Sequence, residues 1–410
     1  MNYIHILLHF NEFHSFQINL SDKERQALAR APHIIDSIPS SYERRPAYWQ
    51  HIDEATWQSP LWQFDHRITS AQALAPFIAL TPDEITAIER TASSFSMAIS
   101  PHFIALMRDE YGAACPIRRQ AIPTTAELLP SRDLLSDPLG ERPRAIAPCA
   151  IHRYPDRALI YATPQCAMRC RHCTRRTRVG SEECVTQTDR TAAIDAICAD
   201  ENIRDVLISG GDPLALSNET LESIIAPLRA CPHIDIIRLC TRMVSTMPQR
   251  FFDHQLIEML SRYAPIYVNT QFNHPFEATR ESIIAMKHLR SAGCILGNQS
   301  VLLKNINDNA DDLEALYRFL TKHGCRPYYL FLCDVAQGTD HFRTTIDSGL
   351  AIMKHLRGRL SGLSIPHFVI DLPNGYGKVD LAPNSIVERD GRRIVFDNWF
   401  GEKVTYFEPQ

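Results

Sequence analysis

The chain has 410 residues, 45% of them hydrophobic, so it can form one large domain with an extension or two domains. Its formal net charge is −4 and it carries no basic tract, so we expect no nucleic acid partner. No apolar run approaches the roughly 18 residues of a membrane-spanning helix, so we expect no membrane partner.

Residues 1–45 carry no motif that can be interpreted, and we expect an N-terminal extension there. Residues 46–150 show a helical pattern that ends in a connector rich in proline and arginine. Within this region TPDEITAIER predicts a helix start, because Thr81 can cap the helix and Glu84 stands where a capping box needs it.

From residue 151 onward, short β-branched runs alternate with stretches of helical period, at the spacing of a βα unit. Six such units predict an α/β fold: a parallel (βα)6 barrel or partial barrel over residues 151–380, followed by a C-terminal segment, 381–410. Polar residues gather after the strands, at the rim where barrels keep their chemistry. The runs are RALIYAT (157–163), DVLISGG (205–211), IDIIRLCTR (234–242), IYVNTQF (266–272), ILGNQSVLL (295–303) and YYLFLCD (328–334), with a seventh, HFVIDLP, before NGYGK.

Twelve cysteines are a high count. Several lie inside apolar runs such as IIRLC and LFLCD, where cysteine behaves as a small buried hydrophobe. This usage favours a reducing, cytoplasmic compartment over a disulfide framework. The start, MNYIHILLHF, lacks a basic flank and a cleavage site, so we do not interpret it as a signal peptide. Nine cysteines are scattered: Cys115, Cys149, Cys184, Cys198, Cys231, Cys240, Cys294, Cys325 and Cys333.

The other three, Cys166, Cys170 and Cys173, lie within eight residues in PQCAMRCRHCTRR. Four thiolates would make a closed zinc or iron–sulfur site, whereas three leave one coordination position open. The pattern C-x3-C-x2-C just after the first barrel strand resembles the radical S-adenosylmethionine (SAM) superfamily. The resemblance implies a [4Fe–4S] cluster whose fourth iron chelates SAM, and a partial (βα)6 barrel with an N-terminal helical region and a short C-terminal extension.

SGGDP follows the second predicted strand, where that superfamily carries a glycine-rich motif that meets SAM. Glycines at such a place let the backbone approach a ligand closely. The resemblance therefore implies a SAM-binding role for Ser209, Gly210, Gly211 and Asp212.

Longer motifs narrow the resemblance to one family. HRYPDR, QCAMRCRHCTRR, DVLISGGD, NTQFNHP, LGNQSVLL, RPYY and DLPNGYGK occur in the order, and close to the spacing, found in the lysine 2,3-aminomutase family, over roughly residues 48–408. That family uses both SAM and pyridoxal 5′-phosphate (PLP). The resemblance implies an isomerase that moves an amino group from the α- to the β-carbon, with Lys378 as the catalytic lysine that carries PLP.

Five further residues match family positions with assigned roles. Arg153, Tyr154 and Arg157 in HRYPDR match the positions that hold the PLP phosphate, and guanidinium groups suit phosphate oxygens. Gln299 matches a further PLP contact. Arg175 matches the arginine that pairs with the carboxylate of the substrate.

Two acidic residues are expected to determine the substrate specificity. Asp334 and Asp371 match the pair that receives the distal ammonium of lysine. Two carboxylates that face one pocket repel each other unless a cation neutralises them, so the pair favours a basic amino acid. The resemblance thus implies conversion of L-lysine to β-lysine. Glutamate-specific relatives change these positions, and this chain does not.

The chain also departs from the family pattern. Relatives often bind zinc through a C-terminal cysteine cluster and one cysteine in the barrel. This chain ends at YFEPQ and has Asn309 at the internal position, so we expect no structural zinc. Phe331 stands where a tyrosine is expected, Gln271 stands in place of histidine, and Tyr376 adds bulk beside the PLP lysine.

Three alternatives to a lysine aminomutase stay open. The departures could reshape the pocket for arginine, whose guanidinium could bridge the two acids through forked bonds. A protein-modifying relative linked to elongation factor P is a second alternative, and a non-catalytic iron–sulfur or zinc-binding module is a third. The cluster implies an external one-electron donor of flavodoxin or ferredoxin type, and the family implies a homo-oligomer.

Overall fold

The computed structural model describes residues 38–181 and 184–410, so most of the predicted N-terminal extension lies outside the described residues. The described residues fall into two compact units, which divide between Asn384 and Ser385. Each unit is described by itself. The boundaries proposed at residues 45, 150 and 380 stay predictions.

The larger unit is built on an open ten-stranded sheet in which each strand pairs with its neighbour in the sequence. Strands β3 to β9 are parallel, while β1, β2 and β10 add antiparallel edges. All seven parallel strands coincide with the predicted runs, so the partial barrel is confirmed. The strands are β1 (Ala145–Ala147), β2 (Ala150–Tyr154), β3 (Arg157–Thr163), β4 (Asp205–Gly210), β5 (Ile236–Cys240), β6 (Tyr267–Thr270), β7 (Ile295–Leu302), β8 (Cys325–Leu332), β9 (His367–Leu372) and β10 (Gly377–Asp380).

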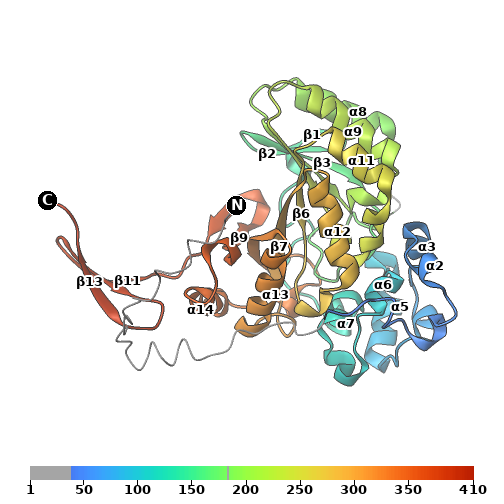
Figure 1. Cartoon of the computed structure of the whole chain (residues 1–410), viewed down its shortest axis with the longest axis horizontal. Coiled ribbons are helices and arrows are strands. Elements are labelled where there is room, and N and C mark those ends of the chain that lie inside the picture. The colour runs from blue at the N-terminus through green and yellow to red at the C-terminus, as the bar shows by residue number, and fades with distance from the viewer. Residues whose placement is uncertain (1–37, 182–183) are drawn as a thin grey trace, which may run out of the picture. The chain divides into compact units, whose positions relative to one another are not determined.

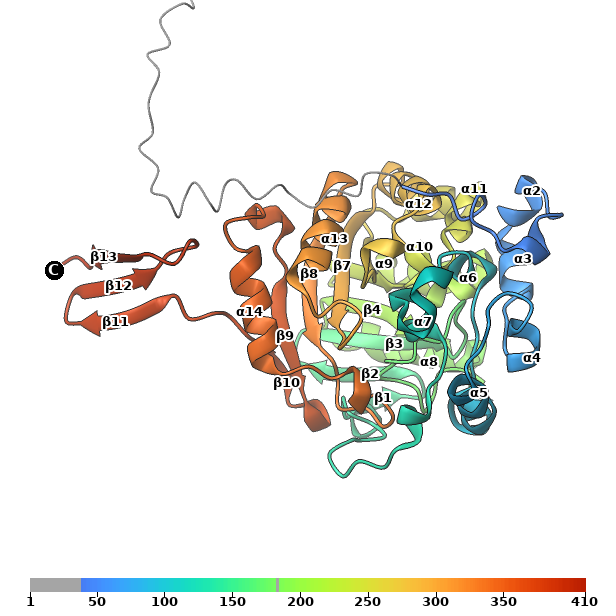
Figure 2. The same cartoon turned by 90° about the horizontal axis from the view of Figure 1, so that it is seen from below.

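Helices connect the parallel strands and lie on the outer side of the sheet, as Figures 1 and 2 show. They form because their apolar residues recur at helical spacing: in α13, Leu313, Leu316 and Leu320 are fully buried while Asn309 caps the first turn. The crossover helices are α8 (Gln187–Cys198), α9 (Asn218–Ala230), α10 (Met243–Thr246), α11 (His254–Arg262), α12 (Arg280–Ser291), α13 (Ala310–Lys322) and α14 (Ile346–Leu356). Short 3₁₀ turns lie in the connecting segments after β4: η5 (Pro213–Ala215), η6 (Pro248–Phe252), η7 (Pro275–Glu277), η8 (Asp340–Phe342), η9 (Gly362–Ser364) and η10 (Pro373–Gly375).

The predicted helical region before the barrel consists of short helices with a core of their own, around Trp57 and Phe103. The predicted capping box is confirmed, because the Thr81 hydroxyl accepts from the Glu84 backbone and the Glu84 carboxylate accepts from the Thr81 backbone. The elements are η1 (Ala47–Trp49), α2 (Glu54–Trp57), α3 (Pro60–Asp65), α4 (Ala71–Leu74), α5 (Pro82–Phe95), α6 (Pro101–Ile104), η2 (Asp109–Ala114), α7 (Pro116–Ala121), η3 (Thr125–Leu128) and η4 (Arg142–Arg144).

The smaller unit contains a three-stranded antiparallel sheet in the order β11, β12, β13. Its strands are β11 (Ile386–Asp390), β12 (Arg393–Asp397) and β13 (Lys403–Phe407). Ile394 and Val395 of β12 are buried. Among the helices of residues 38–181 and 184–410, none is long and apolar enough to cross a membrane.

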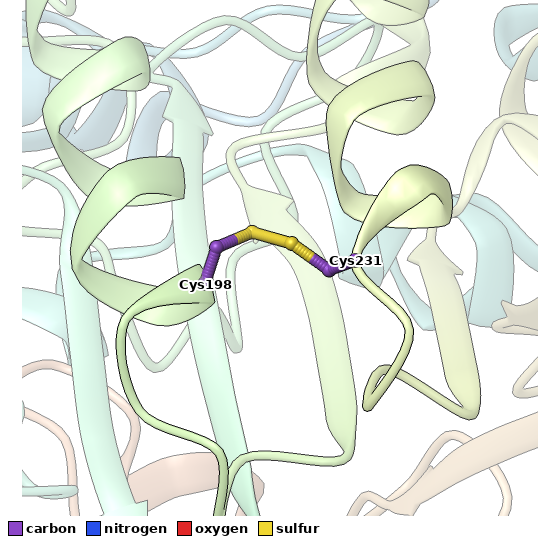
Figure 3. Close-up of a disulfide and its surroundings, with 2 residues drawn as sticks. All are labelled: Cys198 and Cys231. Carbon is purple, nitrogen blue, oxygen red and sulfur yellow. A yellow bond between two sulfur atoms is a disulfide. The ribbon is translucent and has the colours of Figure 1, made fainter.

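One disulfide is present among the scattered cysteines, whose pattern in the sequence did not favour a disulfide framework. Cys198 ends α8, Cys231 caps α9, and the two are bonded (Figure 3). They lie 33 residues apart, about one βα unit, so they occupy matching ends of neighbouring parallel helices with their Cα atoms 6.2 Å apart. The other ten cysteines form no disulfide.

Candidate active site

One cavity of about 440 Å³ opens at the carboxyl ends of the parallel strands. Its lining includes residues from β2 on one side of the sheet to β10 on the other, so the sheet curves around it. Every candidate site residue named from the sequence lines this one cavity. They are Arg153, Tyr154, Arg157, Cys166, Cys170, Cys173, Arg175, Ser209, Gly210, Gly211, Asp212, Gln299, Asp334, Asp371 and Lys378.

The three cysteines lie on the loop between β3 and α8. Cys166 is tied to the N-terminal helices, because Arg67 Nη1 donates to its carbonyl oxygen at 2.5 Å. Burial, and then the neighbouring Cys170, raise the pKa of the Cys173 thiol to about 11. Three partly buried free thiols that face one cavity suit a metal centre, since bound metal favours the thiolate form.

Glu127 of η3 anchors the same loop through two buried ion pairs. Arg171 Nε and Nη2 donate to its carboxylate at 2.9 and 2.6 Å, and Arg176 Nη2 donates at 2.5 Å. The side chains of Glu127 and Arg171 are 1% and 0% exposed. Although burial opposes it, the two guanidinium groups lower the pKa of Glu127. The cysteine loop is therefore held by charge in a dry environment.

We expect Glu127→Gln to destabilise the protein by about 3–5 kcal/mol, because removing one partner leaves buried charges without compensation. Chemical denaturation of the purified protein measures this change. The exposed Glu89→Gln is the matched control and should change stability by less than about 0.5 kcal/mol. Equal stability of the two variants would contradict the anchoring role of Glu127.

Lys378 faces Asp371 across a tight hairpin. The turn between β9 and β10 uses positive φ angles at Asn374, Gly375 and Gly377, and it places Lys378 opposite Asp371 in the register. Lys378 Nζ lies 2.8 Å from Asp371 Oδ2, and its backbone N–H donates to the Tyr154 hydroxyl at 2.9 Å. The lysine is thus held at the cavity by both its side chain and its backbone.

Arg153 belongs to the same cluster of charges. Its Nη2 donates to Asp371 Oδ1 at 2.8 Å and to the Tyr154 hydroxyl at 3.1 Å. Asp371 is therefore neutralised by two cations. Asp334 is not paired in this way: burial, and then the charge of Asp371, raise its pKa to about 7. The two acids thus have different electrostatic surroundings in the same cavity.

Comparison with known proteins decides the family. Residues 160–320 match the profile of the Radical SAM superfamily, and residues 353–410 match the profile described as lysine-2,3-aminomutase. The L-lysine 2,3-aminomutase of Fusobacterium nucleatum is 41% identical over 367 residues, which are 89% of this chain and 86% of that protein. The chain belongs to the lysine 2,3-aminomutase family. It is an isomerase of the radical SAM class, so the non-catalytic alternative is set aside.

Two other relatives frame the question of substrate for this aminomutase. A putative L-lysine 2,3-aminomutase of Aquifex aeolicus is 42% identical over 88% of this chain and 97% of that protein. The glutamate 2,3-aminomutase of Clostridioides difficile is 41% identical over 86% of this chain and 83% of that protein. These relatives have different substrates but are equally similar to this chain. Overall sequence identity therefore does not indicate the substrate, which must be inferred from the residues that line the cavity.

The radical SAM family implies SAM and a [4Fe–4S] cluster, and the loops at the cavity fit both. Gly210 has a φ of +118°, and a Cβ on Gly211 would lie 2.3 Å from the carbonyl oxygen of Gln165. Both glycines are therefore needed for the SGGD loop to lie against the cysteine loop. The Asp212 carboxylate accepts from Thr241 Oγ1 at 2.9 Å, so it also ties this loop to the one after β5.

Arg175 has a partner that the sequence did not indicate. Its Nε and Nη2 donate to Glu141 at 2.9 and 2.6 Å, and its Nη1 donates to Ser209 Oγ at 3.3 Å. Glu141 lies 34 residues upstream in the connector, with no motif around it. It orients the guanidinium of this aminomutase at the cavity wall.

The three departures from the family pattern have different positions. Phe331 and Gln271 line the cavity, and the Phe331 ring centre lies 4.9 Å from Lys378 Nζ. Tyr376 is 79% exposed and is absent from the lining, so the expectation that it adds bulk beside Lys378 is wrong. The hairpin turn directs it outward. Asn309 caps α13, and the absence of structural zinc stays a prediction.

Proposed function

We propose that this aminomutase moves the α-amino group of a basic L-amino acid, L-lysine first, to the β-carbon with the help of PLP. The observation that carries the substrate class is the pair Asp334 and Asp371 in one cavity. The raised pKa of Asp334 reflects burial and the like charge of Asp371, and a distal ammonium between them would relieve both costs. An anionic side chain at this place would increase the repulsion.

The two ends of lysine then have separate partners. The distal ammonium binds Asp334 and Asp371, where it replaces Lys378 Nζ as the neighbour of Asp371. The substrate carboxylate binds the guanidinium of Arg175, which Glu141 holds in place. These contacts orient the substrate so that its α- and β-carbons lie between the cysteine loop and Lys378.

The residues around Lys378 fit PLP. Arg153, Tyr154 and Arg157 would hold its phosphate, Gln299 would contact it, and Lys378 would carry it. When bound, PLP supplies a carbonyl carbon that can hold the migrating nitrogen. Arg153 links the phosphate site to Asp371, so binding of PLP and of substrate share one network of charges.

The cysteine loop and the SGGD loop would hold the second pair of groups. Cys166, Cys170 and Cys173 would ligate the cluster, and the SGGD residues 209–212 would bind SAM. When bound, these groups supply a reversible abstraction of one hydrogen atom. A flavodoxin or ferredoxin would provide the electron. We place the enzyme in the cytoplasm, since ten of its twelve cysteines form no disulfide, and expect a homo-oligomer.

Arginine is the second candidate substrate. A guanidinium can donate forked bonds to two carboxylates, and Phe331 lines the cavity where the family pattern has a tyrosine. A substrate linked to elongation factor P remains the third candidate.

An anaerobic competition assay tests the proposal. The protein is reconstituted with iron, sulfide, PLP, SAM and reductant, and is offered equal amounts of lysine, arginine, ornithine and glutamate. We expect β-lysine as the main product by mass spectrometry. β-Arginine would favour the second candidate. The absence of any β-amino acid, with cluster and PLP bound, would overturn the proposal for free amino acids.

The KM for lysine should depend on pH through Asp334. Because its pKa is raised to about 7, the carboxyl is protonated and uncharged below that pH. An ammonium binds the ionised form, so we expect KM to rise by up to about tenfold per pH unit below 7 and to level off above it. Steady-state kinetics between pH 6 and 8.5 measure this. Asp334→Asn should remove the pH dependence of KM. If the pH dependence persists in that variant, a group other than Asp334 causes it.

A further inference from the structure

A buried arginine contacts one of the three cysteine sulfurs. Arg242 follows β5, at the start of α10, and is 8% exposed. Its Nη1 lies 2.8 Å from Cys170 Sγ. Among the side chains of residues 38–181 and 184–410, it is the one that donates a hydrogen bond to a sulfur of the three.

Arg242 is fixed in place by partners on three other segments, two of which contact its guanidinium. Nη2 donates to Gln120 Oε1 at 2.5 Å and to Glu277 Oε2 at 3.2 Å. Its backbone N–H donates to Asp212 Oδ2 at 2.8 Å, which joins it to the SGGD loop. Gln120 lies on α7 and Glu277 on η7, so the position of Arg242 depends on the N-terminal helices as well as on the barrel.

A fixed cation beside a ligating sulfur has a defined electrostatic effect. The extra electron of a reduced iron–sulfur cluster is shared with its sulfurs, and hydrogen bonds to these sulfurs are among the factors that set the potential. A charge that water does not screen acts more strongly than one at the surface. Glu277 offsets part of the charge, but its oxygen contacts Nη2, at 3.2 Å, whereas the sulfur is contacted by Nη1.

We propose that Arg242 raises the reduction potential of the cluster by donating to Cys170 Sγ, and so eases the transfer of an electron from the one-electron donor. The cluster takes up one electron, and no bond forms or breaks at Arg242. The inference deepens the proposed function and rests on its cluster, but it does not depend on which amino acid is the substrate.

Three variants test this role. Arg242→Met removes both the charge and the donor, Arg242→Lys keeps the charge and loses the planar fork, and Arg250→Met is the matched control. Arg250 is also 8% exposed, and its side chain donates to Leu214, Leu216, Asn218 and Asp253 and to no cysteine. Each full-length protein is reconstituted anaerobically, and its iron and sulfide are counted. An EPR-monitored redox titration without SAM then gives the midpoint potential.

We expect Arg242→Met to lower the equilibrium constant for one-electron reduction about tenfold, a shift of about 59 mV to more negative potential. Arg242→Lys should shift the potential less, and Arg250→Met should match the unchanged protein. Because Arg242→Met leaves Glu277 without its cation, the double variant Arg242→Met/Glu277→Gln is measured as well and should show the same direction of shift.

Three results would overturn the proposal. One is a full cluster with unchanged potential in the Arg242 variants. Another is unchanged potential with weaker SAM binding, which would make Arg242 a SAM ligand instead. The third is loss of the cluster in all Arg242 variants but not in Arg250→Met, which would give Arg242 only a structural role. The reduction potentials can be interpreted even if the amino acid assay yields no product. The two proposals can therefore be refuted independently of each other.

Discussion

Lys378→Ala should lower the rate of β-amino acid formation by a factor on the order of 10²–10⁴ or more, the range for loss of a positioned proton-transfer group. The reason is that the ε-amino nitrogen is the one atom of this side chain that can bond covalently to PLP. In the structure it lies 2.8 Å from Asp371 at the cavity, with its backbone fixed by Tyr154. Among the described residues that line the cavity, Lys378 is the one lysine.

The measurement combines turnover with spectroscopy. The unchanged protein loaded with PLP should show an absorption band that borohydride removes, and Lys378→Ala should lack that covalent adduct by mass spectrometry. Lys287→Ala is the control, because Lys287 is an exposed lysine on α12 outside the cavity. Normal turnover by Lys378→Ala would refute the PLP role of this lysine.

Asp334→Asn should raise the KM for lysine about 10- to 100-fold. A hydrogen bond to a charged group contributes about 1.5–3 kcal/mol, and each 1.4 kcal/mol is about tenfold in affinity. The amide keeps the shape of the carboxyl but cannot supply its charge. Asp371 remains, so binding should weaken without being lost, and selectivity against glutamate should fall.

Competition kinetics with lysine and glutamate measure both effects. Asp340→Asn is the control, since Asp340 follows the same strand but its side chain is 59% exposed and pairs with Arg343. An unchanged KM for lysine in Asp334→Asn would show that the distal ammonium binds elsewhere. The two predictions separate the cofactor end of the cavity from the substrate end.

Much of this enzyme follows from local patterns in its sequence. The β-branched runs marked all seven parallel strands, because a strand buried on both faces must be apolar along its length. The capping box at Thr81 was readable since it depends on residues three apart. The candidate site residues were found by motif, because many of them follow the carboxyl ends of strands, where a barrel topology brings such residues to one cavity.

Other features were decided only by the tertiary structure. Glu141 and Arg175 are 34 residues apart, Glu127 and Arg171 are 44 apart, and Arg242 and Cys170 are 72 apart. A lone acid or arginine carries no local signal, so its partner depends on how the sheet curves and where the N-terminal helices pack. The outward direction of Tyr376 and the bond between Cys198 and Cys231 have the same cause. The sequence by itself determined the parallel strands, the chemistry of the loops and the candidate site residues. Folding decided which charges neutralise each other there, because electrostatic pairing depends on distance in space and not on order along the chain.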